Sequence, residues 1–439
     1  MIKIGTPFVF DDGQFAYLKA SVKISEDTAR AYMSLPSRIK NVHWRLYEDY
    51  PPAIWDREDE GLWFAVPMAY KEYLCPERSD AFVAAMLWYA MITGSDIACE
   101  APVSTKMAFG IQYHLVPALM KEEQGYAHPI RLVADTTDKP YRNIGAVGTG
   151  MSCGVDSMYT LDVYSRADVP PKYRLTHLTY FNMGAIFHPD RETRKVYSMI
   201  EFYEITDKMS EEKLRNAGQV AEKSGLPLLY VKSNLDSDYY RGAYGDTGVY
   251  RNCACVLAVA GLFGRYYCSS GGSNYFELNL GKGSELYESL LCSALSTEST
   301  EFILSDYATR LEKMQTLVFD NLSKQYLDVC YRFHNCGECD KCLRTLVTLD
   351  VMGSLDVFSE VFDIEKYKAN RKEAFFWLLR MKDKVGDDAI HAKLVYDFAM
   401  RRGFQIPAES IKEYEKYQKQ RKYRKIRKAI SNIFIKFRS

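Results

Sequence analysis

The stretch Ile144-Gly-Ala-Val-Gly-Thr-Gly-Met-Ser-Cys-Gly-Val-Asp-Ser157 decides the fold class of this 439-residue chain. An apolar, strand-like run passes into a loop rich in Gly and Ser, and a helix is expected to begin near Asp156. Small residues let backbone N–H groups approach an anion, and a helix N-terminus adds partial positive charge. The segment therefore predicts a phosphate-binding loop, although a plain glycine-rich turn would have the same composition.

Three side chains of this loop could act on a phosphate group. Ser152 and Ser157 offer hydroxyls to phosphate oxygens. Asp156 would be repelled by the phosphates unless a divalent cation lay between them, so its position predicts Mg²⁺. The segment is not a Walker A loop, because no Gly-Lys-Ser/Thr follows it.

The sequence around this loop alternates between short apolar runs and helix-like segments. The runs are residues 144–147, 175–181, 226–231 and 265–268, and the clearest helix-like segments are residues 210–224 and 249–263. Such alternation is typical of an α/β protein with a parallel sheet and helices on both faces. Sites in these sheets lie at the carboxyl ends of the strands, where we expect Asn182, Ser269 and Ser270.

The six residues Ser152-Cys153-Gly154-Val155-Asp156-Ser157 resemble the SGGxDS loop of the PP-loop ATP pyrophosphatases, with Cys153 in place of the first glycine. The resemblance implies the adenine nucleotide α-hydrolase fold and an ATP site formed by these six residues. In that family the loop holds the β- and γ-phosphates while the α-phosphate is attacked and pyrophosphate leaves. It further implies an adenosine position near Asn182. Cations near the pyrophosphate are also implied, for which Arg310 and Lys313 are candidates.

Four cysteines form a second pattern, Cys330-x5-Cys336-x2-Cys339-x2-Cys342, here called the cysteine knuckle. Four thiolates at this spacing suit structural zinc. An iron–sulfur cluster is the main alternative, and His334 could replace Cys330 as a ligand.

The segment His334-Asn-Cys-Gly-Glu-Cys-Asp-Lys-Cys-Leu-Arg344 is similar to the zinc-binding element of the 7-cyano-7-deazaguanine synthases, which are PP-loop enzymes. That element also follows the nucleotide domain in those enzymes. The resemblance covers about residues 140 to 350, roughly half of the chain, so it does not extend to the deazaguanine substrate.

We expect four regions along the chain. They are an N-terminal α+β accessory domain (1–140), the PP-loop domain with the cysteine knuckle (141–350), a helical region (351–411) and a basic amphipathic tail (412–439). The tail has eleven Lys or Arg against two Glu, a net charge of +9. Since the whole chain has 57 basic and 57 acidic residues, the rest carries −9.

The apolar stretches and the start of the sequence indicate where in the cell the protein is expected. The longest apolar stretch, residues 81–94, holds about fourteen residues, fewer than the roughly 20 that span a bilayer. No export signal is recognised at the start, so a cytoplasmic protein with reduced cysteines is expected. In the tail, Ile426, Ile430, Ile433 and Phe437 recur at helical spacing among basic residues. Such a helix could bind the inner membrane surface, RNA or the acidic body of the chain. The sequence does not decide whether the protein forms a homo-oligomer.

These observations predict an ATP-dependent ligase. The expected reaction is adenylylation of a carbonyl or carboxylate oxygen of a small-molecule acceptor, followed by attack of ammonia or an amine, with ATP, Mg²⁺ and Zn²⁺ as cofactors. Asp156, Arg310 and Lys313 are the expected catalytic residues. One alternative is sulfur transfer to a tRNA base or a small molecule, for which Cys253 and Cys255 form an available pair. The other is a non-catalytic nucleotide-binding protein.

Overall fold

The computed structural model describes residues 1–34, 61–121, 127–184, 199–240, 244–269, 287–384 and 387–436. It divides the chain into two compact units, Met1–Tyr307 and Ala308–Ser439. The boundaries expected after residues 140 and 350 differ from this division. The physical reason is that strands from the first 140 residues belong to the same sheet as the phosphate loop.

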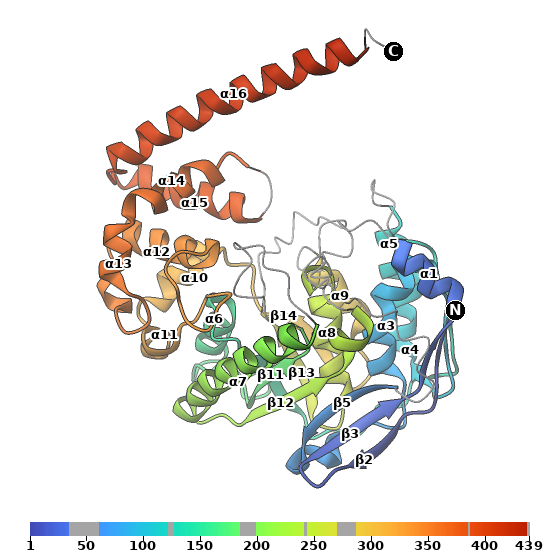
Figure 1. The fold of residues 1–439 in the computed structure, drawn as a ribbon. Helices are drawn as coiled ribbons and strands as arrows, with labels where there is room; N and C mark the ends of the chain where they lie inside the picture. The colour runs from blue at the N-terminus through green and yellow to red at the C-terminus, as the bar shows by residue number, and fades with distance from the viewer. Residues whose placement is uncertain are drawn as a thin grey trace. The chain divides into compact units, whose positions relative to one another are not determined.

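The first unit is built on an eight-stranded sheet with the order β14-β13-β10-β11-β12-β5-β3-β2 (Figure 1). The five strands from β14 to β12 are parallel, and β5, β3 and β2 extend the sheet with antiparallel pairing. The expected α/β class with a parallel sheet is confirmed, within a sheet that is mixed as a whole. The strands are β2 (Phe8–Asp11), β3 (Phe15–Ala20), β5 (Leu62–Pro67), β10 (Ala146–Gly150), β11 (His177–Asn182), β12 (Leu228–Ser233), β13 (Phe263–Cys268) and β14 (Glu301–Leu304).

The N-terminal strands are joined to the parallel part through β5 and β12. Lys232 pairs with Ala65 and Ser233 with Phe64, and the hydroxyl of Ser233 donates to the carbonyl of Trp63 at 2.6 Å. The remaining strands of this unit form two small sheets. They are β1 (Ile2–Ile4), β4 (Val22–Ile24), β6 (Ile97–Cys99) and β8 (Leu132–Val133), and the pair β7 (Val103–Ser104) and β9 (Thr136–Thr137).

Helices cover both faces of the parallel strands. The Tyr180 hydroxyl lies 3.4 Å from that of Ser210 in α7, whereas Met183 contacts Cys255 in α8, so α7 and α8 lie on opposite faces. The helices of the first unit are α1 (Glu26–Ser34), η3 (Met68–Tyr73), α3 (Asp80–Thr93), α4 (Thr105–Phe109), η4 (Gly110–Leu115), α5 (Val116–Leu119), α6 (Val155–Tyr164), α7 (Met199–Ser224), η5 (Leu235–Tyr240), α8 (Tyr244–Ala258) and α9 (Glu288–Leu295).

The core of the first unit lies where α3 packs against α8. In α3 every residue from Asp80 to Ile92 is buried, and in α8 every residue from Cys253 to Ala258 is buried. A helix without a polar face is stable only when other elements surround it. The N-terminal segment is therefore part of the core that supports the phosphate loop.

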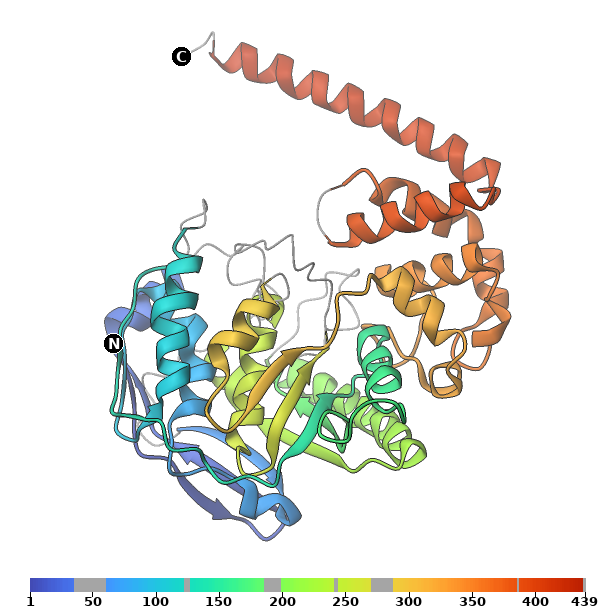
Figure 2. The same cartoon turned by 180° about the vertical axis from the view of Figure 1, so that it is seen from behind.

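The second unit is helical within its described residues, as expected for the region after the knuckle. Ser410 and Glu413 fasten the start of its last helix, α16, to Lys372 of α14, and α16 then extends past α14 in both views (Figures 1 and 2). The helices are α10 (Arg310–Leu317), α11 (Asn321–Tyr326), α12 (Asp340–Met352), η7 (Asp356–Phe358), α13 (Ile364–Ala369), α14 (Arg371–Met381), α15 (Asp387–Arg401) and α16 (Ala408–Lys436). Among the described residues, none of the helices combines the length and apolarity needed to cross a bilayer.

Candidate functional site

The phosphate loop, residues 152–157, follows β10 at the point where the order of the parallel strands reverses. β10 lies between β13 and β11, and the chain continues from it to β11 on one side and reaches β13 only later. Ligands of doubly wound sheets bind outside the carboxyl ends of the strands at such a point. The Thr149 hydroxyl links β10 to β13. It donates to the carbonyl of Tyr267 at 3.0 Å and lies 3.3 Å from the hydroxyl of Ser269. Ser269 is thus next to the loop, whereas Ser270 is outside the described residues.

Hydrogen bonds within the loop hold its two serines close together. The hydroxyls of Ser152 and Ser157 lie 3.2 Å apart, and the Gly154 amide donates to the hydroxyl of Ser152 at 3.3 Å. Gly154 is the N-cap of α6 and has no side chain with which to cap the first turn. Val155 and Asp156 open the helix, so backbone amides, two hydroxyls and one carboxylate meet at a helix N-terminus. This arrangement can bind an anion.

Cys153 has a left-handed backbone conformation with a φ of 59°, the only positive φ of a non-glycine residue in the described part of the chain. A side chain in this region costs about 1–2 kcal/mol, because its Cβ approaches the following carbonyl oxygen. The side chain is buried and only 1% exposed. The loop therefore keeps the backbone shape that favours glycine, even though cysteine occupies the position.

Asn182 lies at the carboxyl end of β11, on the face that α7 covers. Its side-chain amide donates to the Tyr230 hydroxyl at 3.4 Å. Burial and then the nearby Glu211 carboxylate raise the pKa of Asp207 in α7, while a hydrogen bond with Asn182 opposes the shift. Asn182, Asp207 and Tyr230 form a polar cluster that could contact the hydroxyls or the ring nitrogens of a nucleoside.

Arg310 and Lys313 belong to the second unit, where both lie in α10. The Thr309 side chain and Glu312 form a capping box that fixes the start of this helix. Lys313 is 1% exposed, so it is not the solvated surface charge that is usual for lysine. Their expected contact with pyrophosphate stays a prediction.

The cysteine knuckle brings its four sulfur atoms within 4.8 Å of one another. The sulfur atoms of Cys330 and Cys339 are 3.8 Å apart and those of Cys336 and Cys342 are 3.9 Å apart. Tetrahedral zinc with Zn–S bonds of about 2.3 Å requires a separation of roughly 3.8 Å. The knuckle could therefore hold a metal ion such as zinc, and its fourth ligand is Cys330 and not His334, which is exposed.

The backbone around the knuckle favours charged thiolates. The amides of Glu338 and Cys339 donate to the sulfur of Cys336 at 3.4 and 3.3 Å, which Gly337 permits by turning the chain with a φ of 75°. Hydrogen bonds from the neighbouring thiols, that of Cys330 above all, hold the pKa of Cys336 well below its usual value, whereas the same contacts raise the pKa of Cys330 and Cys342 as long as no metal is bound. Lys366 donates to the carbonyl of Cys336 at 3.0 Å and forms an ion pair with Glu338 at 2.8 Å. A deprotonated knuckle is the state that binds metal.

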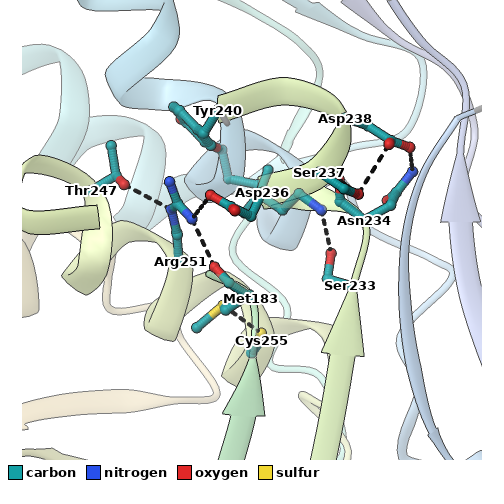
Figure 3. Close-up of polar contacts among 12 residues, drawn as sticks. Met183, Ser233, Asn234, Asp236, Ser237, Asp238, Tyr240, Thr247, Arg251 and Cys255 are labelled. Atoms are coloured by element: carbon teal, nitrogen blue, oxygen red, sulfur yellow. Dashed lines mark hydrogen bonds and ion pairs between the residues drawn. The ribbon is translucent and has the colours of Figure 1, made fainter. Parts of the chain in front are cut away.

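A buried ion pair outside the predicted site residues was not predicted from the sequence. Arg251 of α8 and Asp236 of η5 meet at 2.7 Å near the carboxyl ends of β11 and β12 (Figure 3). The signal was present as a single arginine inside the apolar segment 249–263. A charge at such a position is stable only with a partner, but the sequence does not say which residue provides it.

Comparisons with known proteins add no family to these observations, because no family model, no curated protein and no solved structure matches the chain. The resemblance to PP-loop enzymes rests on the motifs of the chain and stays a prediction.

Proposed function

We propose that the protein is an ATP pyrophosphatase of the PP-loop type, which adenylylates an acceptor and releases pyrophosphate. The observation that carries the proposal is the position of residues 152–157, which join β10 to the N-terminus of α6 where the strand order reverses. This position, the paired hydroxyls of Ser152 and Ser157 and the carboxylate of Asp156 are all features that ATP and Mg²⁺ would need.

In this proposal the loop residues act on the leaving group. The amides at the start of α6, together with Ser152 and Ser157, bind the β- and γ-phosphates, and Asp156 is the ligand of Mg²⁺. Ser269 lines the phosphate end, and Asn182 faces the nucleoside. Mg²⁺ held by Asp156 would neutralise charge that develops on pyrophosphate, and the fixed donors of the loop would stabilise that charge without reorganisation.

The acceptor is a carbonyl or carboxylate oxygen of a small molecule, which attacks the α-phosphate. Ammonia or an amine then attacks the carbon that carries the adenylylated oxygen and AMP leaves, which forms an amide from a carboxylate or an amidine from an amide carbonyl. A nitrile would need a second ATP: the oxygen of a primary amide is adenylylated, and AMP and a proton then leave without a further nucleophile. Zinc in the knuckle has a structural role here, since all four of its positions would be taken by Cys330, Cys336, Cys339 and Cys342.

The sulfur-transfer alternative needs a reactive cysteine pair apart from the knuckle. Cys253 and Cys255 are both 0% exposed, and burial raises the pKa of both thiols, which keeps them uncharged. A neutral buried thiol is a poor nucleophile. This burial favours nitrogen transfer over sulfur transfer by this pair.

The test is pyrophosphate release from Mg²⁺–ATP across a panel of carboxylate and carbonyl acceptors, each with and without ammonium. We expect at least one acceptor to stimulate release and AMP to form in equal amount. A chain that binds ATP but releases no pyrophosphate with any acceptor would support the non-catalytic alternative. ADP in place of AMP would contradict pyrophosphatase chemistry.

A further inference from the structure

Arg251 is a fully buried charge at the carboxyl edge of the sheet. Its Nη1 donates to the carboxylate of Asp236 and to the carbonyl of Met183, both at 2.7 Å, and its Nε donates to the hydroxyl of Thr247 at 2.7 Å (Figure 3). The guanidinium carbon lies 4.7 Å from the centre of the Tyr240 ring. Arg251 is 0% exposed and Asp236 8%, so these contacts replace the water that both charges lose.

These contacts join three segments that are separate in the sequence. Met183 follows β11, Asp236 lies in η5 after β12, and Arg251 lies in α8. We call the four residues Met183, Gly184, Asp236 and Arg251 the β11 clamp. Gly184 has a φ of 89°, and a Cβ at this position would lie 2.3 Å from the Asp236 side chain and 2.7 Å from Nη1 of Arg251. The backbone therefore passes so close to the ion pair that only glycine fits.

The end of β11 is held from both faces of the sheet. Asn182 points toward α7 and donates to Tyr230, while the next residue, Met183, is held on the α8 side by Arg251 and contacts the Cys255 sulfur at 3.3 Å. The phosphate loop has contacts that do not involve the clamp, which are those of Thr149 with β13 and of the loop serines with each other. Its contact with β11 is made further back along the strand, where the Met151 amide donates to the carbonyl of Thr179 at 2.7 Å. The clamp thus acts on the carboxyl end of β11, beyond the residue that contacts the loop.

We propose that Arg251 is a positioning residue for the nucleoside end of the site and sets the place of Asn182 without contacting the nucleotide. The inference rests on the proposed function, because it takes Asn182 as the residue nearest to adenosine. A displaced carboxyl end of β11 changes the binding of the nucleoside, whereas the phosphate end keeps its own contacts. Small displacements of positioned groups have large effects on binding and rate.

The test compares two probes, adenosine and Mg²⁺–pyrophosphate, by calorimetric titration of the full chain. Arg251→Lys and Gly184→Ala should each weaken adenosine binding by about tenfold and leave pyrophosphate binding unchanged. Ser152→Ala should do the reverse. Arg131→Lys, which alters the bidentate pair of Arg131 with Asp96, is the matched control and should change neither.

The outcomes separate the clamp from the proposed function. If the wild-type chain binds both probes and Arg251→Lys weakens both equally, or neither, the inference is wrong while the proposed function stands. If the wild-type chain binds neither probe nor ATP, both fail. Thermal unfolding shows whether Arg251→Lys is folded. If Arg251→Lys does not fold, the test uses Gly184→Ala, because this variant keeps both charges of the ion pair.

Discussion

The phosphate loop and the cysteine knuckle are both recognised by short motifs, yet the chain builds them differently. The knuckle takes all its ligands from Cys330 to Cys342, and one glycine turn with N–H···S bonds brings them together. The loop depends on distant segments: the amide of Met151, the residue before it, donates to Thr179 at 2.7 Å, and Thr149 contacts Ser269. A metal site made by one segment follows from ligand spacing, whereas a phosphate site also needs the order of the strands.

This comparison predicts the largest effect at the knuckle, where metal binding contributes to folding itself. Cys342→Ser or removal of metal by a chelator should unfold the second unit, since structural zinc contributes on the order of 10 kcal/mol in small domains. Metal analysis and calorimetry check this, with about one zinc per chain expected. Cys75→Ser, at a buried thiol of the first unit, is the control and should keep the metal. Iron with labile sulfide would contradict zinc.

The loop should respond in activity and not in stability. Asp156→Asn removes the expected Mg²⁺ ligand, and pyrophosphate release should fall at least roughly 10²-fold, which corresponds to about 3 kcal/mol of transition-state stabilisation. Asp162→Asn is the matched control on the same helix, where Asp162 only pairs with Arg166 on the surface. Undiminished release by Asp156→Asn would overturn the role of this residue.

One buried carboxyl group of the first unit and the knuckle of the second should respond to acid in opposite directions. Burial raises the pKa of Asp80 in α3 to about 6, against an unfolded value near 3.8. The folded state thus holds its proton more tightly, so this stabilisation is present below pH 4 and lost as the pH rises to about 6. The change is about 3 kcal/mol at 1.36 kcal/mol per pKa unit. The knuckle instead loses metal as acid protonates its thiolates.

Calorimetry of the wild type and Asp80→Asn between pH 4 and 7 isolates this carboxyl group. The stability of the wild type relative to the variant should fall with rising pH and level off above about 6. A constant difference would show that Asp80 has an ordinary pKa.

A smaller effect is expected from the strained backbone at Cys153. Cys153→Gly should be about 1 kcal/mol more stable than Cys153→Ala, because alanine keeps the strained Cβ and glycine does not. At Cys292 in α9 the order should reverse, since glycine is about 1 kcal/mol worse than alanine within a helix. Denaturant unfolding of the four variants measures both differences. The same order at both positions would mean that Cys153 is not strained.

The smallest effect on catalysis is expected from the tail. Four residues of α16 that lie beyond its contacts with α14 are exposed, namely Lys419, Gln420, Lys422 and Tyr423. A chain ending at Gln420 should release pyrophosphate at the wild-type rate and lose co-sedimentation with anionic vesicles at low salt. Neutral vesicles are the control. If the full chain binds RNA and does not bind anionic vesicles, the expected binding of the tail to the membrane surface is wrong.

Local patterns in the sequence predicted much of the parallel part of the sheet. The runs 175–181 and 226–231 correspond to β11 and β12, because their Val, Thr, Tyr and Phe side chains favour strands. The expected helix 210–224 is the second half of α7, which begins earlier at Met199. The four cysteines of the knuckle were also predicted from their spacing.

Pairings between distant segments were not predictable in the same way. Nothing in Leu62–Pro67 says that it pairs with β12, so the sequence does not predict that the first 140 residues contribute strands to this sheet. Arg251 was visible only as a charge in an apolar segment, and its partner lies in η5. Both features come from topology, which local periodicity does not contain.

The pairing of β5 with β12 also means that the sheet cannot be completed until late in the synthesis of the chain. The chain carries Trp63 long before its partner Ser233, which is 170 residues further on. At about 5–20 residues per second, the nascent β2, β3 and β5 wait roughly 10–30 s with one edge of β5 unpaired. An unpaired edge is a template for aggregation, so we expect the emerging chain to need a chaperone until β12 is made.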